Sequence, residues 1–272
     1  MKKEKVILNA RETTSVRWPV EDKKAKLIIV HGLGEHVSRY DVISKEFNDA
    51  GIEMVGFDQR GHGENPGKKG HVDSFDLFLK DLHDFVEKER DDVPLFMLGH
   101  SLGGLIAARY VEEYPNSLKG VVLSSGAFVS DNVSSILKLL VNILSSISVF
   151  SKITFSNGID PSTLSRNEKI VRDYQEDPLV HNKITARLAS EIFKNISIVF
   201  EKANDFSLPV LFVAGEADKV VPPRGTKKLF LQVASKDKKM EIFKGAYHEI
   251  FCDPEHQQRF RRTIVEWILA HI

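Results

Sequence analysis

Gly99-His100-Ser101-Leu102-Gly103 follows the apolar run Val93-Pro94-Leu95-Phe96-Met97-Leu98 and precedes a helix expected over Leu105–Tyr114. Strand, sharp turn and helix in this order are the setting in which G-x-S-x-G exposes a serine at the edge of a sheet. Glycine is needed on both sides because a Cβ in so tight a turn would collide with neighbouring backbone. The turn places the Ser101 hydroxyl at a helix N-terminus, which favours developing negative charge. The sequence therefore predicts a nucleophilic serine.

The composition is ordinary for a globular enzyme. The chain has 272 residues, of which 42% are hydrophobic and 28% are charged, and this length suits one large α/β domain with an insertion. Its 38 basic and 38 acidic residues cancel. No long-range field therefore argues for nucleic acid or for an anionic membrane surface as a partner.

The N-terminal residues and the single cysteine indicate the cellular compartment in which the protein is expected. The opening residues, MKKEKVILNARE, are basic but lack the apolar segment of a signal peptide. No run of roughly eighteen apolar residues occurs, so we expect no transmembrane span. The single cysteine, Cys252, excludes an intrachain disulfide and fits a reducing compartment. The sequence predicts a cytoplasmic protein, with peripheral membrane association as an open alternative.

Short β-type runs alternate with helical patterns, which is typical of a mostly parallel sheet covered by helices on both faces. An opening hairpin is expected over Val6–Leu8 and Thr14–Trp18. Buried strands are expected over Lys26–Val30, Met54–Phe57, Leu95–Leu98, Val121–Ser124, Val210–Ala214 and Met240–Phe243. Helices are expected over Ser38–Ala50, Phe75–Arg90, Leu105–Tyr114, Arg224–Val233 and Pro254–His271.

One region interrupts this alternation. From about Phe128 to Phe206 no buried strand is evident, and so long an interruption favours an inserted cap over a loop. We therefore predict an α/β core formed by residues 1–127 and 206–272, and a cap, or lid, formed by residues 128–205.

Two loops downstream of Ser101 supply the acid and the base that a nucleophilic serine requires. Asp218 lies in the loop after the strand expected over Val210–Ala214, and His248 lies in the loop after the last expected strand. Open α/β sheets place their sites at the carboxyl ends of parallel strands. We therefore predict Ser101, Asp218 and His248 as a catalytic triad. Glu216 competes with Asp218, but the spacing G-x-x-D favours Asp218.

Backbone N–H groups that receive an oxyanion are expected at two places. One belongs to Leu102, the residue after the nucleophile. The other belongs to Leu33 in His31-Gly32-Leu33-Gly34, a loop after an expected strand in which the glycines let the backbone turn inward. The histidines lack zinc-ligand spacing, and no nucleotide-binding glycine motif is present. We therefore expect neither a metal nor another cofactor.

The loop Phe57-Asp58-Gln59-Arg60-Gly61-His62-Gly63 carries charged residues to which we assign a structural role. An ion pair between Asp58 and Arg60 is expected to hold this loop beneath the site. His62 is given no catalytic role. Cys252, which follows His248 closely in the chain, is interpreted as an incidental thiol rather than a nucleophile.

With these motifs, the chain resembles the monoacylglycerol lipase and lysophospholipase family of α/β-hydrolases. His31-Gly32-Leu33-Gly34-Glu35-His36, followed by Arg39-Tyr40, is similar to that family's H-G-x-G-E-H-x-x-R-Y. The resemblance extends to the D-x-R-G-H-G loop, the serine turn, and the acid and base loops. It also includes Tyr174-Gln175-Glu176-Asp177-Pro178-Leu179, which is similar to Y-x-x-D-P-L. Leu102 departs from the family, which often has methionine there, and Asn65 stands where serine is common.

The resemblance implies a serine hydrolase with a lid that cleaves the ester bond of monoacylglycerols through an acyl-enzyme. It also implies that Glu35, Arg39, His100 and Tyr174 lie near the glycerol end of the substrate. A broader carboxylesterase or a lysophospholipase is the alternative, and an acyltransferase or a non-catalytic lipid-binding protein is a more distant one. Acyl chain length, positional preference and oligomeric state stay open at this point.

Within the expected cap, Ile136–Phe150 reads ILKLLVNILSSISVF. Lys138, Asn142, Ser145 and Ser146 fall on one helical stripe, and apolar residues occupy the rest. Three interpretations compete: a buried cap helix, a wall of the acyl tunnel, or a surface that contacts lipid aggregates. Because a small cap has little interior, we predict that this helix lines the acyl entrance and makes transient contact with membranes.

Overall fold

The computed structural model describes residues 1–130 and 134–272. Its central eight-stranded sheet consists of β1 (Lys2–Leu8), β2 (Arg11–Trp18), β3 (Ala25–Val30), β4 (Ile52–Phe57), β5 (Leu95–His100), β6 (Gly120–Ser124), β9 (Val210–Gly215) and β10 (Lys238–Phe243). The strand order is β1-β2-β4-β3-β5-β6-β9-β10. β2 pairs antiparallel with β1 and β4, and the other neighbours are parallel. The predicted hairpin and mostly parallel sheet are confirmed.

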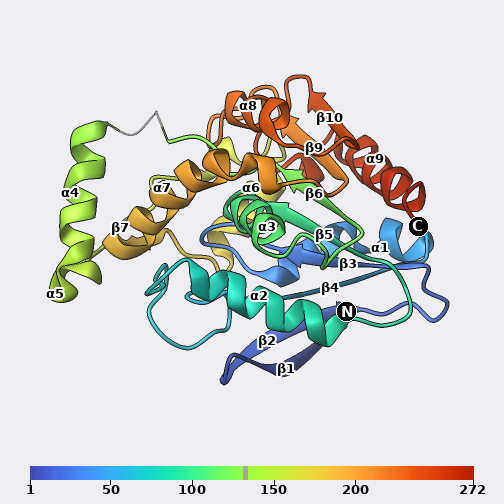
Figure 1. Ribbon diagram of the computed structural model, residues 1–272, viewed down its shortest axis with the longest axis horizontal. Helices are drawn as coiled ribbons and strands as arrows, with labels where there is room; N and C mark the ends of the chain where they lie inside the picture. Colours follow the sequence, from blue (N-terminus) through green and yellow to red (C-terminus); the bar gives the residue numbers. More distant parts are fainter. Residues whose placement is uncertain (131–133) are drawn as a thin grey trace.

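Helices cover both faces of this sheet, namely α1 (Asp41–Asp49), α2 (Asp76–Glu89), α3 (Leu102–Glu113), α8 (Arg224–Gln232) and α9 (Gln257–Leu269) (Figure 1). Successive side chains of a strand point to opposite faces. Ile28 and Val30 of β3 accordingly join the core cluster that contains α2, α3 and α8. Leu27 and Ile29 join the cluster that contains α1 and α9. The sheet thus lies between two helical layers.

Some helix boundaries differ from the predicted ones. α1 begins at Asp41 because the preceding residues, Val37–Tyr40, form a 3-10 turn. α3 begins at Leu102, directly after Ser101, rather than at Leu105. Two adjacent glycines hide this first turn in the sequence, since glycine is a poor helix former. Ser101 therefore lies at the helix N-terminus itself.

The stretch between β6 and β9 contributes no strand to the central sheet among the residues described. It forms α4 (Ser135–Ser146), α5 (Ser148–Ser151), α6 (Glu168–Glu176), α7 (Ala186–Glu201) and the small antiparallel pair β7 (Thr154–Ser156) and β8 (Lys183–Thr185). The division into a core and a cap at residues 128 and 205 stays a prediction.

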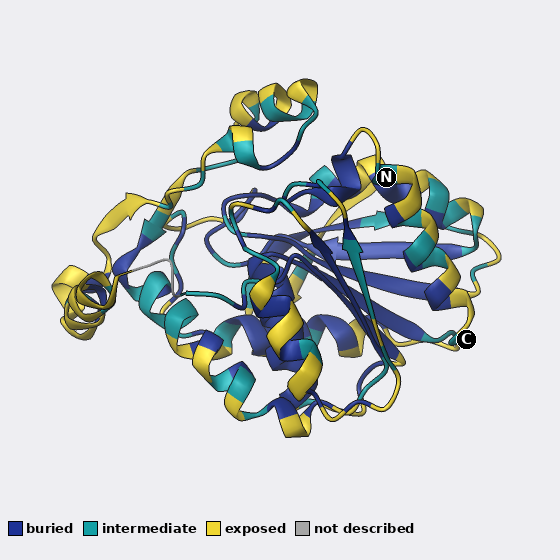
Figure 2. Cartoon of the chain, turned by 90° about the horizontal axis from the view of Figure 1, so that it is seen from above, coloured by how far each residue is buried: buried dark blue, intermediate teal, exposed yellow. Residues whose placement is uncertain are grey.

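The apolar helix expected over Ile136–Phe150 is two helices, α4 and α5, because the chain leaves helical geometry at Ile147 (φ −97°, ψ 113°). Ser145 is buried and Lys138 is half-buried, so part of the polar stripe faces the protein. The exposed apolar side chains of α4 are Ile136, Leu137, Leu139, Leu140 and Ile143. Figure 2 shows this helix, at the far left, coloured mostly as exposed. Burial of the apolar face is therefore the wrong interpretation for most of α4.

No described helix is at once long enough and apolar enough to cross a lipid bilayer. The exposed apolar side of α4 is too short for a span, since a membrane-crossing helix needs about 20 apolar residues.

Candidate active site

Ser101 occupies the turn between β5 and α3 with φ 55° and ψ −120°. This backbone conformation is strained for a residue with a side chain and persists only where the surroundings impose it. The Ser101 N–H donates to the Ser124 carbonyl (3.0 Å), and its own carbonyl accepts from the Ala127 N–H (2.9 Å). A Cβ on Gly103 would collide with the carbonyl oxygen of Val30. The turn is thus fixed by β6 and by close packing against β3.

His248 and Asp218 form a buried pair. His248 Nδ1 lies 2.7 Å from Asp218 Oδ2, and the two side chains are 3% and 0% exposed. The other carboxylate oxygen accepts the N–H groups of Val220 (2.9 Å) and Val221 (2.8 Å). Burial alone would lower the pKa of His248, but the charge and the hydrogen bond of Asp218 outweigh it and raise that pKa. The pair directs the Nδ1 proton to the carboxylate and leaves Nε2 for other partners.

Ser101 and His248 line the same pocket. The remaining lining residues are Gly32, Leu33, Glu35, His100, Ile159, Leu164, Tyr174 and Glu249. The pocket volume is only about 10 Å³, which is close to the least that holds one water molecule. Little space is therefore left beside Ser101, and Ile159, Leu164 and Tyr174 from the stretch between β6 and β9 form part of the lining.

One of the two predicted oxyanion donors lines this pocket. Leu33 lines it, and the Gly32 N–H beside Leu33 donates to Glu35 Oε1 (2.6 Å), which fixes the loop after β3. Leu102 is the first residue of α3, and the first N–H groups of an α-helix have no acceptor within the helix. Their assignment as the oxyanion hole stays a prediction.

Three of the four residues predicted near the glycerol end line the pocket, namely Glu35, His100 and Tyr174. Burial, aided by the neighbouring His248 ring (4.7 Å between centroids), lowers the pKa of His100 to about 3. His100 is therefore neutral at physiological pH. Arg39 instead pairs with two carboxylates and stacks 4.8 Å over the Tyr174 ring.

The sequence did not identify Glu249 as a partner of Arg39. Arg39 Nη1 donates to Glu35 Oε2 (2.6 Å), and both of its terminal nitrogens donate to Glu249. Burial alone would raise the pKa of Glu35, but Arg39 reverses the effect and lowers it. The signal for Glu249 in the sequence was its position directly after His248. Its separation from Arg39 by 210 residues left no local pattern to identify the pair.

The loop after β4 is held differently from the prediction. Asp58 accepts hydrogen bonds from the backbone N–H groups of Val37 (3.0 Å) and Glu64 (2.9 Å). Arg60 pairs with Asp81 of α2 through both Nε and Nη2. The predicted pair between Asp58 and Arg60 is therefore wrong, because each side chain has a nearer partner outside the short loop.

Two further side chains near the site carry no catalytic signal. Burial lowers the pKa of His62 well below its ordinary value, so its ring is neutral. Burial raises the pKa of the Cys252 thiol well above its ordinary value, and the side chain is 4% exposed. A protonated, inaccessible thiol is a poor nucleophile.

The chain has recognisable relatives. Residues 21–255 match the family described as serine aminopeptidase, S33. The chain is 30% identical to the monoacylglycerol lipase of Mycolicibacterium smegmatis, over 93% of this chain and 91% of that protein. It is 32% identical, over 98% of its length, to an abhydrolase domain-containing protein of Dictyostelium discoideum, of which it spans 29%. The crystal structure of the Paleococcus ferrophilus monoacylglycerol lipase is similar at 40% identity and a TM-score of 0.89, covering 96% of this chain and 100% of that one.

Proposed function

Because the chain belongs to the serine aminopeptidase S33 family of α/β-hydrolases, we propose that it hydrolyses the ester bond of monoacylglycerols to a fatty acid and glycerol. The relatives from Mycolicibacterium smegmatis and Paleococcus ferrophilus are monoacylglycerol lipases. The observation that carries the proposal is the buried His248–Asp218 pair, 2.7 Å apart, of which His248 lines the same pocket as Ser101.

In the proposed reaction, Ser101 Oγ attacks the ester carbonyl while His248 Nε2 accepts its proton. Asp218 holds the Nδ1 proton and stabilises the imidazolium. The N–H groups of Leu33 and Leu102 receive the negative charge on the carbonyl oxygen. The bond to the glycerol oxygen then breaks as His248 returns the proton to it. Water attacks the acyl-enzyme by the same route and releases the fatty acid.

The polar end of the pocket supports a small, hydroxylated leaving group. Glu35, His100 and Tyr174 line the pocket beside Ser101, and they supply acceptors and donors for the two free hydroxyls of a monoacylglycerol. A triacylglycerol lacks these hydroxyls and would leave buried polar groups unpaired, which is costly. The side chains of Ile159, Leu164 and Tyr174 must move before an acyl chain fits, because the pocket is so small.

The exposed apolar side of α4 supports contact with lipid aggregates. Its exposed leucine and isoleucine side chains lie on a helix of twelve residues with one charged residue, Lys138. Contiguous apolar surface of this kind on a protein commonly marks a site of interaction with a protein or a membrane. We infer that α4 rests on the lipid surface from which the substrate is taken.

A substrate series tests the proposed function. Fatty-acid release is measured from a 1-monoacylglycerol, a diacylglycerol and a lysophospholipid that share one acyl chain. Preference for the monoacylglycerol supports the hydroxyl-binding pocket. Equal rates on all three substrates support the broader carboxylesterase instead, and preference for the lysophospholipid supports a lysophospholipase.

A further inference from the structure

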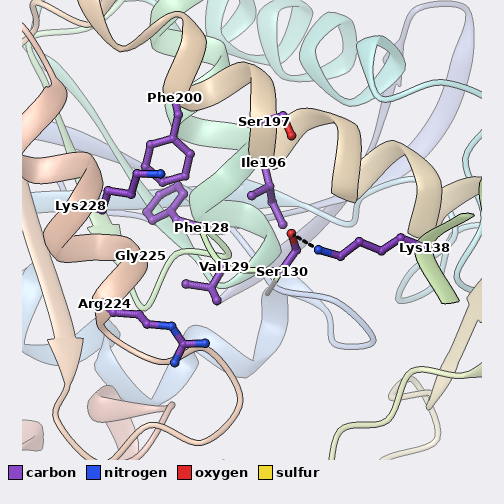
Figure 3. A pocket seen from close by; sticks show the side chains of 10 residues that line it. All are labelled: Phe128, Val129, Ser130, Lys138, Ile196, Ser197, Phe200, Arg224, Gly225 and Lys228. Carbon is purple, nitrogen blue, oxygen red and sulfur yellow. Dashed lines mark hydrogen bonds between the residues drawn. The ribbon is translucent and has the colours of Figure 1, made fainter. Parts of the chain in front are cut away.

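A second pocket lies between α7, α8 and the segment that follows β6 (Figure 3). Its volume is about 460 Å³, which is within the range of small-molecule sites. None of its lining residues lines the pocket of Ser101. The two pockets are therefore separate, and the proposed reaction assigns no role to the larger one.

The floor of this second pocket is apolar. Phe128 and Ile196 are 2% and 7% exposed, and Phe200 of α7 stands beside them. In Figure 3 the rings of Phe128 and Phe200 lie close together, Ile196 lies farther toward Ser130, and the charged side chains stand at the edges. An alkyl chain placed here would be removed from water, which is favourable.

The rim of the pocket is cationic. Lys138 of α4 and the residues Arg224 and Lys228 of α8 line it, and none of the lining residues is acidic. Lys138 Nζ donates to Ser130 Oγ (3.0 Å), and Lys228 Nζ stands 4.4 Å over the Phe200 ring. Among the described residues, no carboxylate pairs with either lysine. Both ammonium groups therefore retain donors for an anion.

We propose that this pocket binds a long-chain fatty acid in its carboxylate form. The carboxylate accepts a hydrogen bond from one of the two rim lysines, Lys138 or Lys228, and the alkyl chain covers Phe128, Ile196 and Phe200. A fatty acid is the acidic product of the hydrolysis proposed above, so the identity of the ligand rests on that function. The binding itself does not require Ser101.

The placement of α4 favours a free fatty acid over the headgroup of a bilayer lipid. Lys138 faces α7, with its ammonium group 5.7 Å from the Phe193 ring. Asn142, one turn further along α4, accepts a hydrogen bond from Ser190 of α7 (2.8 Å). The side of α4 that carries Lys138 therefore packs on the protein, while Leu139, Leu140 and Ile143 are exposed. A lipid that remains in a bilayer beneath those exposed residues would lie on the other side of the helix from the pocket.

The binding test uses the full chain and sodium dodecanoate below its micelle concentration, followed by isothermal titration calorimetry. The double variant Lys138→Gln/Lys228→Gln removes both lysine charges and retains the floor. The matched control is Lys227→Gln, an exposed neighbour on α8 that does not line the pocket. We expect the double variant to bind dodecanoate about tenfold more weakly or worse, because a hydrogen bond to a charged group is lost. The control should bind as the wild type does.

Further measurements distinguish binding in this pocket from binding beside Ser101 and from binding to a lipid headgroup. Dodecanol, which has the chain without the charge, should bind much more weakly than dodecanoate, and sodium acetate should not bind measurably. Dodecanoate bound beside Ser101 would survive the double substitution, so equal affinity in the wild type and the double variant would overturn the proposal. Loss of binding to vesicles that contain phosphatidylglycerol, with dodecanoate binding intact, would overturn it in favour of a headgroup site.

The outcome is independent of the proposed hydrolysis. The titration is repeated with Ser101→Ala, in which dodecanoate binding is expected to be unchanged. Failure of the wild type to cleave monoacylglycerols would refute the proposed function without altering the titration. Thermal unfolding of the double variant, followed by circular dichroism, verifies that it folds as the wild type does.

Discussion

Arg39 and Glu249 are joined by two hydrogen bonds, 2.8 Å from Nη1 to Oε1 and 2.9 Å from Nη2 to Oε2. Such a paired geometry fixes orientation as well as distance. Arg39 also binds Glu35, which lies in the loop of the predicted oxyanion donor, while Glu249 directly follows His248. One guanidinium thus connects the loop after β3 with the loop of the proposed base. We infer that Arg39 positions both loops.

Replacement of Arg39 by methionine is expected to destabilise the fold strongly. The change leaves two carboxylates buried without their cation, and breaking a buried pair in this way costs about 3–5 kcal/mol. Urea denaturation followed by fluorescence measures the free energy of unfolding. Arg39→Lys should lose less, because it keeps the charge without the paired geometry. An Arg39→Met variant as stable as the wild type would show that the network does not stabilise the site.

Removal of a surface lysine provides the matched control for Arg39. Lys45 pairs with Asp49 at the surface of α1, where both side chains are largely exposed. Lys45→Met is expected to leave the urea midpoint unchanged, since exposed ion pairs contribute little.

Asp218→Asn is expected to lower kcat by roughly 10⁴, as loss of the orienting carboxylate does in other triads. It should also change the pH dependence. His248 must be neutral to accept a proton, so activity falls as the pH drops through its pKa. Asp218 helps to hold that pKa above its ordinary value, so the acidic limb of kcat/KM should move to lower pH in the variant. The profile is measured with a soluble short-chain ester; an unmoved limb would mean that another group sets it.

Leu139→Ser/Leu140→Ser on α4 is expected to reduce binding to liposomes and to leave hydrolysis of a soluble short ester unchanged. Both side chains are more than half exposed, so little packing within the protein is lost. Co-sedimentation with liposomes measures the bound fraction. The control, Leu231→Ser/Leu269→Ser, removes two exposed leucines from α8 and α9. Equal losses of liposome binding and ester hydrolysis in the α4 variant would exclude a specific membrane role.

Cys252→Ala is expected to retain hydrolysis of both short and long esters. The thiol is buried and its raised pKa keeps it protonated. Treatment of the folded wild type with iodoacetamide should accordingly modify Cys252 slowly, and mass spectrometry measures the extent. Rapid alkylation with loss of activity would place this thiol at the accessible site.

The sheet and the serine turn were predictable because their signals are local. Each buried strand is a short apolar run with turn residues at its ends, and the G-x-S-x-G turn specifies strand, bend and helix within a few residues. The partner of Arg39 was not predictable, since nothing near residue 39 identifies a carboxylate at residue 249. The periodicity around Lys138 revealed an amphipathic helix but not which face contacts the protein. The face that contacts the protein is determined by packing against α7. The break at Ile147 was not predictable, because no proline or glycine occurs there.

The most direct test of the account is fatty-acid release from a 1-monoacylglycerol by the wild type and by Ser101→Ala under identical conditions. The account predicts rapid release by the wild type and a rate lower by roughly 10⁴ to 10⁶ in the variant, because the nucleophile of the triad is removed. A variant that releases fatty acid at the wild-type rate would contradict the assignment of Ser101, and a wild type without activity on any monoacylglycerol would contradict the proposed function.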